Sequence, residues 1–214
     1  MFECENVKIG CSFCAELSDL SHLDNFYQNI EADLIVSKRI ILESDNFVVM
    51  PTIGCLVEGY LLVVSKKHYT CMGDLPSLLT NELSSLVEVV KSKINEKFKK
   101  NTVCFEHGGC MGKSGSCVDH AHLHVVPFDT SLTKLMKPYA LNDMTISSLH
   151  DLQFYAPYLY WQDIDGSQHV ATGDFFPSQF FRKIIADYYG LGNEWDWHQF
   201  HHAENMLKTI KDFS

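Results

Sequence analysis

The chain of 214 residues lacks the features that mark membrane-spanning proteins and general nucleic-acid binders. It has no run approaching ~18 consecutive apolar residues, so no membrane-spanning helix is expected. Positive charge is scarce, with 17 Lys and Arg against 27 Asp and Glu and a formal net charge of −10. A general nucleic-acid binder usually carries a basic patch or stripe. We therefore expect neither a membrane nor a nucleic acid as partner.

The N-terminus also lacks the pattern of a targeting signal. The first ten residues, MFECENVKIG, contain no apolar run flanked by basic residues, so no signal peptide is expected. This favours a cytoplasmic location. The eight cysteines are numerous for such a chain. Without a secretory signal, they are expected to be free thiols or metal ligands rather than disulfides.

The hydrophobic pattern predicts an α+β protein. Short strands are expected within residues 39–44 and 46–51, and a buried strand within 59–68. Apolar residues recur at helical spacing from Leu79 to Val90 and predict an amphipathic helix, with Thr80 or Asn81 as its cap. Two more strands follow, within 102–107 and 120–127. This order favours an antiparallel sheet with one long helix.

The last third of the chain differs in character, and no internal repeat or low-complexity linker precedes it. Residues 158–172 predict a hairpin that turns at Asp165 and Gly166. A helix should end near Gly190 or Gly192, and another should close the chain. We therefore divide the chain into a first domain, residues 1–130, and a C-terminal extension, residues 131–214, packed on it.

Three histidines, His120, His122 and His124, stand at every second position of the stretch CVDHAHLHVVPF. Residues at i, i+2 and i+4 of a strand point to one face, so the three imidazoles should share a face while the intervening apolar residues face the core. A solvated sheet face would be the plain interpretation. Three imidazoles in register after a Gly- and Ser-rich loop instead indicate a metal site or phosphate chemistry.

This run resembles the signature of the histidine-triad (HIT) family, His-φ-His-φ-His-φ-φ with φ apolar. Residues 120–126 match it, and Pro127 follows as in many members. Upstream, EGYLLVVSKKH is similar to the family's Gly-His-x-Leu-Val-Ile-Pro-Lys-x-His strand. The resemblance covers roughly residues 11–128. It implies a HIT-like antiparallel sheet in a zinc-bearing, bacterial-type member with a C-terminal extension.

The resemblance also implies a nucleotide substrate and a covalent nucleotidyl-histidine, with His120, His122 and His124 as the catalytic group. His122 would be the nucleophile, because a neutral imidazole can attack phosphorus near pH 7. His124 would contact the phosphate or leaving-group oxygens. We favour a hydrolase acting at the α-phosphorus of a nucleoside phosphate anhydride, ester or phosphoramidate, since the uridylyltransferase branch has glutamine at the position of His124.

Other functions stay open at this point. A nucleotidyltransferase would move AMP or UMP to an acceptor, and a regulatory protein would bind the nucleotide with little turnover. A zinc-stabilised interaction module would bind no nucleotide at all. Homodimers are common in the family, although the C-terminal extension could cover the usual interface.

The loop before the triad is expected to bind the substrate's phosphate. Gly115, Ser116 and Cys117 can turn backbone N–H groups toward an anion, and Lys113 adds positive charge. Glu106 is a further substrate-binding candidate, because it stands where the family often has Asn-x-Gly.

The chain departs from the family pattern at three places. A serine is usual at the position of Cys117, whose thiol is a poorer donor. Thr52 stands near the place of an acidic residue that binds the ribose hydroxyls, and Glu106 and His107 replace the Asn-x-Gly stretch. The nucleobase preference and the leaving group therefore stay open.

Cys11 and Cys14 form a Cys-x-x-Cys pair, which supplies two of the four N or S ligands of tetrahedral zinc from one turn. Such pairs also carry redox chemistry. The resemblance implies that His68 and His120 complete the site, which would be structural. Free thiols at positions 11 and 14 are the alternative. The remaining cysteines have no partner spacing and are expected to be ordinary thiols (Cys4, Cys55, Cys71, Cys104, Cys110 and Cys117).

The tryptophans and histidines of the extension invite a functional interpretation. The sequence favours the plain one, in which Trp195 and Trp197 pack the extension onto the sheet. In the alternative, Gln179, Arg182 or Trp197 borders the site, with Arg182 as an anion contact.

Overall fold

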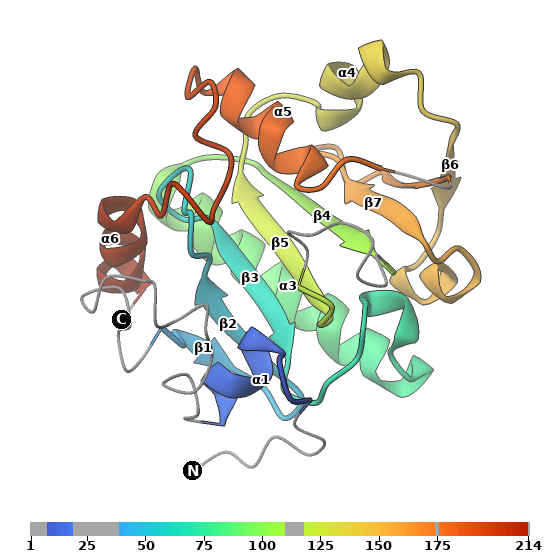
Figure 1. Cartoon of the computed structure of the whole chain (residues 1–214), viewed down its shortest axis with the longest axis horizontal. Helices are drawn as coiled ribbons and strands as arrows, with labels where there is room; N and C mark the ends of the chain where they lie inside the picture. The colour runs from blue at the N-terminus through green and yellow to red at the C-terminus, as the bar shows by residue number, and fades with distance from the viewer. Residues whose placement is uncertain (1–7, 19–38, 110–117, 174–175, 214) are drawn as a thin grey trace.

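The computed structural model describes residues 8–18, 39–109, 118–173 and 176–213 (Figure 1). In these ranges the chain forms an eight-stranded sheet in the order β1-β2-β3-β5-β4-β7-β8-β6, with every neighbouring pair antiparallel. The predicted α+β class with an antiparallel sheet is confirmed. The strands are β1 (Leu42–Glu43), β2 (Phe47–Pro51), β3 (Leu61–Ser65), β4 (Thr102–Gly108), β5 (His122–Pro127), β6 (Asp143–Ile146), β7 (Tyr158–Gln162) and β8 (Gln168–Thr172).

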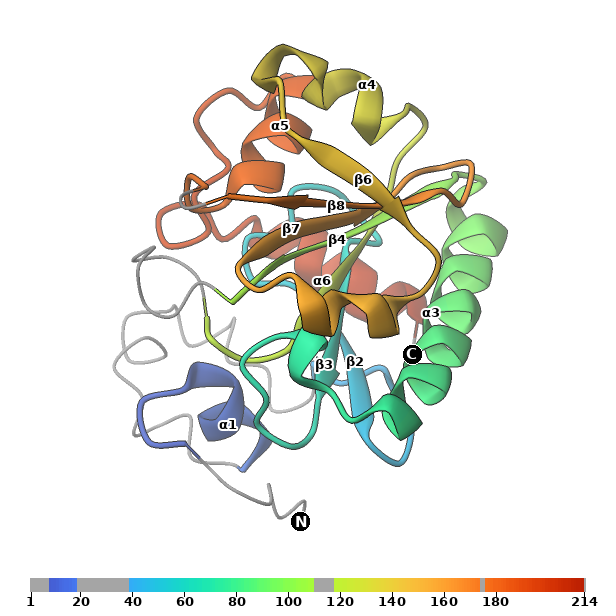
Figure 2. The same cartoon turned by 90° about the vertical axis from the view of Figure 1, so that its right-hand side faces the viewer.

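Helices cover both faces of the sheet. Figure 1 looks onto the sheet with the long helix α3 behind it, and Figure 2 shows α3 on one side of the strands with α1 and α5 toward the other. In the described part of the chain, no helix is long and apolar enough to cross a membrane. The helices are α1 (Ser12–Leu17), α3 (Ser77–Phe98), α4 (Leu132–Met136), α5 (Phe180–Tyr188) and α6 (Ala203–Phe213), with 3₁₀ turns η3 (Met72–Asp74), η4 (Lys137–Tyr139) and η5 (Leu149–Phe154).

Helix α3 follows the predicted amphipathic pattern. Its buried stripe includes Leu83, Val90 and Ile94, and each such side chain contributes roughly 1.5–3 kcal/mol relative to full exposure. The predicted caps are wrong. The helix begins at Ser77, directly after Pro76, so Thr80 and Asn81 already lie inside it.

Strand β5 separates the two faces. Leu123 and Val125 belong to the core beneath α3, whereas His122 and His124 line a pocket on the opposite face. The strand ends at Pro127 as predicted, but it begins only at His122. His120 therefore precedes the pleated part of the chain, and the expectation that all three histidines share one strand face is corrected.

The C-terminal extension continues the same sheet. Strand β7 pairs with β4 from Cys104↔Gln162 to Gly108↔Tyr158, and β8 returns after the predicted hairpin turn. Helix α5 ends near Gly190 as expected. It packs on the pocket face of the sheet, where the Phe181 ring stacks on Phe105 with centroids 4.7 Å apart. The extension therefore reaches the face that carries His122.

Candidate active site and metal centre

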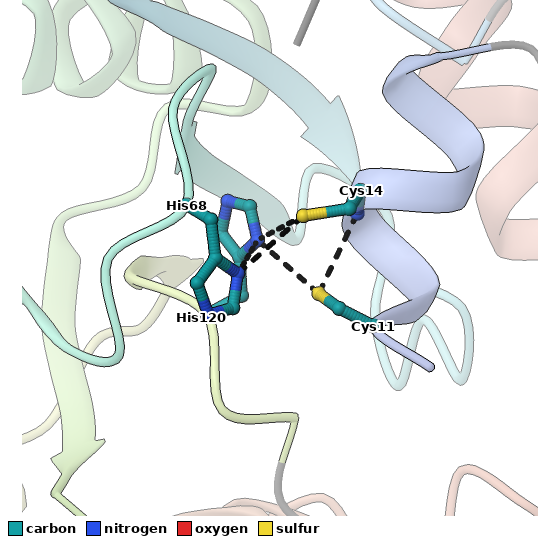
Figure 3. Close-up of side chains that lie close together, drawn as sticks. All are labelled: Cys11, Cys14, His68 and His120. Carbon is teal, nitrogen blue, oxygen red and sulfur yellow. Dashed lines mark hydrogen bonds between the residues drawn. The ribbon is translucent and has the colours of Figure 1, made fainter. Parts of the chain in front are cut away.

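Four side chains converge beside the first turn of α1 (Figure 3). The ligand atoms of Cys11, Cys14, His68 and His120 all lie within 4.8 Å of one another. Nδ1 of His120 is 3.3 Å from the Cys11 sulfur and 3.2 Å from Nδ1 of His68, which is itself 3.4 Å from the Cys14 sulfur. Ligand atoms 2.0–2.3 Å from a tetrahedral zinc lie roughly 3.3–3.8 Å apart. The separations and the donor set both fit zinc.

The hydrogen bond of His120 fixes which ring nitrogen faces the cluster. Nε2 lies 2.7 Å from the Ser65 carbonyl oxygen, and a carbonyl can only accept, so Nε2 carries the proton. The lone pair on Nδ1 is thus directed at the sulfurs and at His68. Burial raises the pKa of the Cys11 thiol to about 12. Metal binding must therefore release a thiol proton.

A pocket of about 800 Å³, including space open to solvent, lies on the sheet face opposite α3. Its lining is largely apolar and aromatic, with Phe13 from α1, Phe105 from β4 and Phe180 from α5. Strand β5 contributes two triad histidines, His122 and His124, to the lining of this pocket. An apolar cavity with a few convergent polar groups is the usual form of a small-molecule site.

His122 is held in one tautomer by its own strand. Its Nδ1 lies 2.5 Å from the carbonyl oxygen of His120, so Nδ1 donates and the lone pair resides on Nε2. The ring packs against Phe13, with centroids 5.2 Å apart, and against His124 at 4.9 Å. Because His120 also belongs to the metal cluster, the cluster positions the carbonyl that orients His122.

His124 is buried between aromatic rings. It stacks on Phe105 with centroids 4.5 Å apart, and its Nδ1 is 2.8 Å from the Tyr60 hydroxyl. Burial lowers its pKa well below 6.5, and the nearby His122 and Arg182 add to the shift. The hydrogen bond to Tyr60 occupies Nδ1 and leaves Nε2 as the remaining ring nitrogen.

This burial predicts a pH-dependent stability. The unfolded chain binds a proton at His124 below about pH 6.5, whereas the folded chain does not. The free energy of unfolding should therefore fall as pH drops from about 6.5 toward the folded pKa. Between pH 7.5 and 5.5, His124→Gln should reduce this loss by about 1.4 kcal/mol. Urea unfolding of both proteins at the two pH values measures it; an unchanged difference would contradict the assignment.

The C-terminal extension supplies one wall of the pocket through Gln179, Arg182 and Trp197. Arg182 is buried and donates from Nη2 to the Gly54 carbonyl at 2.7 Å and from Nε to the Trp195 carbonyl at 2.9 Å. Gln179 accepts from the Trp197 N–H at 3.2 Å. The sequence favoured packing alone for this segment. The structure shows that it packs on the sheet and borders the pocket.

Glu106 does not line the pocket, and the prediction that it binds substrate is corrected. Alternation along β4 turns Glu106 toward the α3 face, where its carboxylate accepts from the Met72 N–H at 2.8 Å and from the Tyr158 hydroxyl. Burial raises its pKa to about 8. The other predicted phosphate-binding residues, Lys113, Gly115, Ser116 and Cys117, lie outside the described residues.

Sequence reasoning missed several residues of the pocket. Phe13, Arg39 and Phe105 line it, as does His107 on β4. Arg39 is fixed by Glu16, with Nε 2.8 Å from the carboxylate. Strand alternation could have placed His107 in the pocket once Phe105 was known to line it. It lies two positions from Phe105 and therefore shares its face of the strand. Thr52 also lines the pocket, near the place where the family often has a carboxylate.

Comparisons with known proteins agree with the triad. Residues 35–131 match the model of the HIT domain. Similar solved structures include a HIT family protein from Bacillus anthracis (19% identity, covering 57% of this chain and 75% of that chain, TM-score 0.44). A Zn-bound histidine triad family protein from Mycobacterium smegmatis is 24% identical (56% and 75% covered, TM-score 0.41). SMU.412c from Streptococcus mutans is 16% identical (64% and 86% covered, TM-score 0.44). No curated protein matches the chain. The family whose model matches residues 35–131 is the one that the His120-x-His122-x-His124 run predicts.

Proposed function

We propose that the chain is a nucleotide hydrolase that acts at the α-phosphorus of a nucleoside phosphate ester, anhydride or phosphoramidate. The observation that carries this proposal is the orientation of His122. A backbone carbonyl fixes the proton on Nδ1, and the ring borders a largely apolar pocket that opens to solvent. A nucleophilic imidazole needs such an unprotonated nitrogen next to the substrate.

In the first step, the Nε2 lone pair of His122 forms a bond to the α-phosphorus, and the bond from phosphorus to the leaving group breaks. The imidazole of the intermediate then carries positive charge. The carbonyl of His120, 2.5 Å from Nδ1, stabilises that charge by accepting a hydrogen bond from the Nδ1–H group. Water then attacks phosphorus and gives up one proton, the N–P bond breaks with its electron pair returning to Nε2, and the nucleotide is released.

The remaining pocket residues would bind and orient the substrate. Neutral His124 donates from Nε2 to a phosphoryl oxygen, while Phe13, Phe180 and Trp197 offer apolar surface for the nucleobase. Zinc, when bound by Cys11, Cys14, His68 and His120, would be structural, because four protein ligands leave no position for an activated water.

Intact-mass spectrometry after rapid acid quench tests the proposal. Wild-type protein is mixed with a panel of nucleotide phosphoramidates, dinucleoside polyphosphates and nucleotide sugars. We expect a mass gain of one nucleotidyl group, which also names the nucleotide. If neither an adduct nor a product forms with any member of the panel, the chain is a nucleotide-binding protein without turnover, and the proposal is wrong. Transfer to an added acceptor in place of hydrolysis would identify a nucleotidyltransferase.

A further inference from the structure

The pocket contains a third imidazole that the triad does not supply. His107 lies near the end of β4 and lines the pocket together with His122 and His124. The β4–β5 ladder ends with Phe105 paired to His124. His107 follows two positions later on β4 and therefore lies on the same strand face as Phe105. The half-buried His107 ring also meets the edge of Phe176, with centroids 6.0 Å apart.

Resting on the proposed function, we propose that His107 is the general acid that protonates the leaving group when His122 attacks phosphorus. This assignment also narrows the substrate class. Protonation matters when the leaving group is a strong base, such as an amine or an alkoxide, and not when it is a stable anion. The site is therefore suited to nucleoside phosphoramidates and alkyl esters.

The other described residues of the lining do not fill this role. His124 is held neutral by burial, with Nδ1 bonded to Tyr60. Arg39 and Arg182 do not release a proton at neutral pH. No carboxyl group belongs to the described lining, and Glu106 faces the other side of β4. The charged or titratable groups that share the described lining with His107 are Arg39, His122, His124 and Arg182.

Position agrees with the chemistry. In an in-line displacement, the leaving group departs on the side of phosphorus away from Nε2 of His122. An acid therefore has to approach the leaving group from a part of the pocket other than the position of His122. His107 comes from the neighbouring strand β4 and lines the same pocket as His122, which gives it a separate approach to a leaving group bound there.

The two steps balance with one proton shuttled by His107. In the first, the N–P bond to His122 forms, the bond from phosphorus to the leaving group breaks, and its electron pair takes the proton of the His107 imidazolium. In the second, water oxygen bonds to phosphorus and neutral His107 accepts the water proton. The N–P bond breaks, and its electron pair returns to Nε2 of His122.

Two substrates that differ only in the leaving group test this role. Single-turnover release is measured from an adenosine 5′-phosphoramidate of hexylamine and from the p-nitrophenyl ester of adenosine 5′-phosphate. For His107→Asn, we expect hexylamine release to fall about 10²- to 10⁴-fold. Nitrophenolate release should stay within about tenfold, because this anion leaves without a proton. His150→Asn, in η5 outside the pocket lining, should leave both rates unchanged.

The pH profile gives a second readout. In wild type, hexylamine release should fall at high pH, where the acid loses its proton, and His107→Asn should lack this limb. Equal losses for both substrates would show a positioning role, and no loss for either would show no role; each overturns the inference while the proposed function stands. If wild type releases neither leaving group and forms no adduct, the proposed function fails, and the inference with it.

Discussion

Replacing His122 by alanine is expected to lower the rate of leaving-group release about 10⁴- to 10⁶-fold, as the loss of a catalytic nucleophile does in other enzymes. The other imidazole that β5 supplies to the pocket is not expected to replace it. His124 lies in the same pocket, but its Nδ1 is hydrogen-bonded to the Tyr60 hydroxyl and its ring is stacked on Phe105. Release of nitrophenolate from the p-nitrophenyl ester of a nucleotide measures the effect.

The matched control is His150→Ala, which removes an imidazole outside the pocket lining and should leave the rate unchanged. Added imidazole should restore part of the rate of His122→Ala, because it can occupy the vacated space and attack phosphorus without forming a protein adduct. A variant at position 122 that keeps its rate within about tenfold would rule out covalent catalysis by this residue.

Removal of zinc is expected to lower the stability of the protein strongly. The loss of a structural metal belongs to the few changes that destabilise a protein by roughly 4 kcal/mol or more. For a chain of this size, that corresponds to a fall in Tm of about 8–16 °C. Without the ion, the lone pairs of His68 and His120 would face each other at 3.2 Å with two buried thiols beside them.

The measurement combines metal analysis with thermal unfolding. Wild type should contain one zinc per chain, and a chelator should lower its Tm. Cys14→Ser should contain no zinc, and its Tm should not respond to chelator. Cys104→Ser is the matched control, because Cys104 is equally buried but lies outside the cluster. If wild-type protein contains no zinc and its Tm does not change with chelator, the zinc site is refuted.

The sequence predicted those parts of the fold whose signal is local. The helix α3, the β7–β8 hairpin and the β5 strand each repeat a pattern within a few residues. The short elements α4 and β6 were missed, because five and four residues are too few to show a period. The metal cluster was predicted only through the family resemblance, since Cys11 and His120 are 109 positions apart.

The site was predicted less completely than the fold, for two physical reasons. The face on which a strand residue lies depends on register, and a one-residue difference exchanges Glu106 for Phe105 or His107. The wall formed by Arg182 and Trp197 depends on where α5 packs. Amphipathicity shows that α5 has an apolar side, but not which face of the sheet that side meets. Long-range packing therefore decided the residues that local patterns could not.

The pairing of β7 with β4 has a consequence for how the chain behaves in a cell. Strand β4 is seven residues long and includes the apolar Val103, Cys104 and Phe105, so its exposed edge would be a template for aggregation. The C-terminal extension covers that edge and moves the sheet ends to β1, with two residues, and β6, with four. Shortening the chain at residue 130 would therefore remove a protective cover as well as a pocket wall.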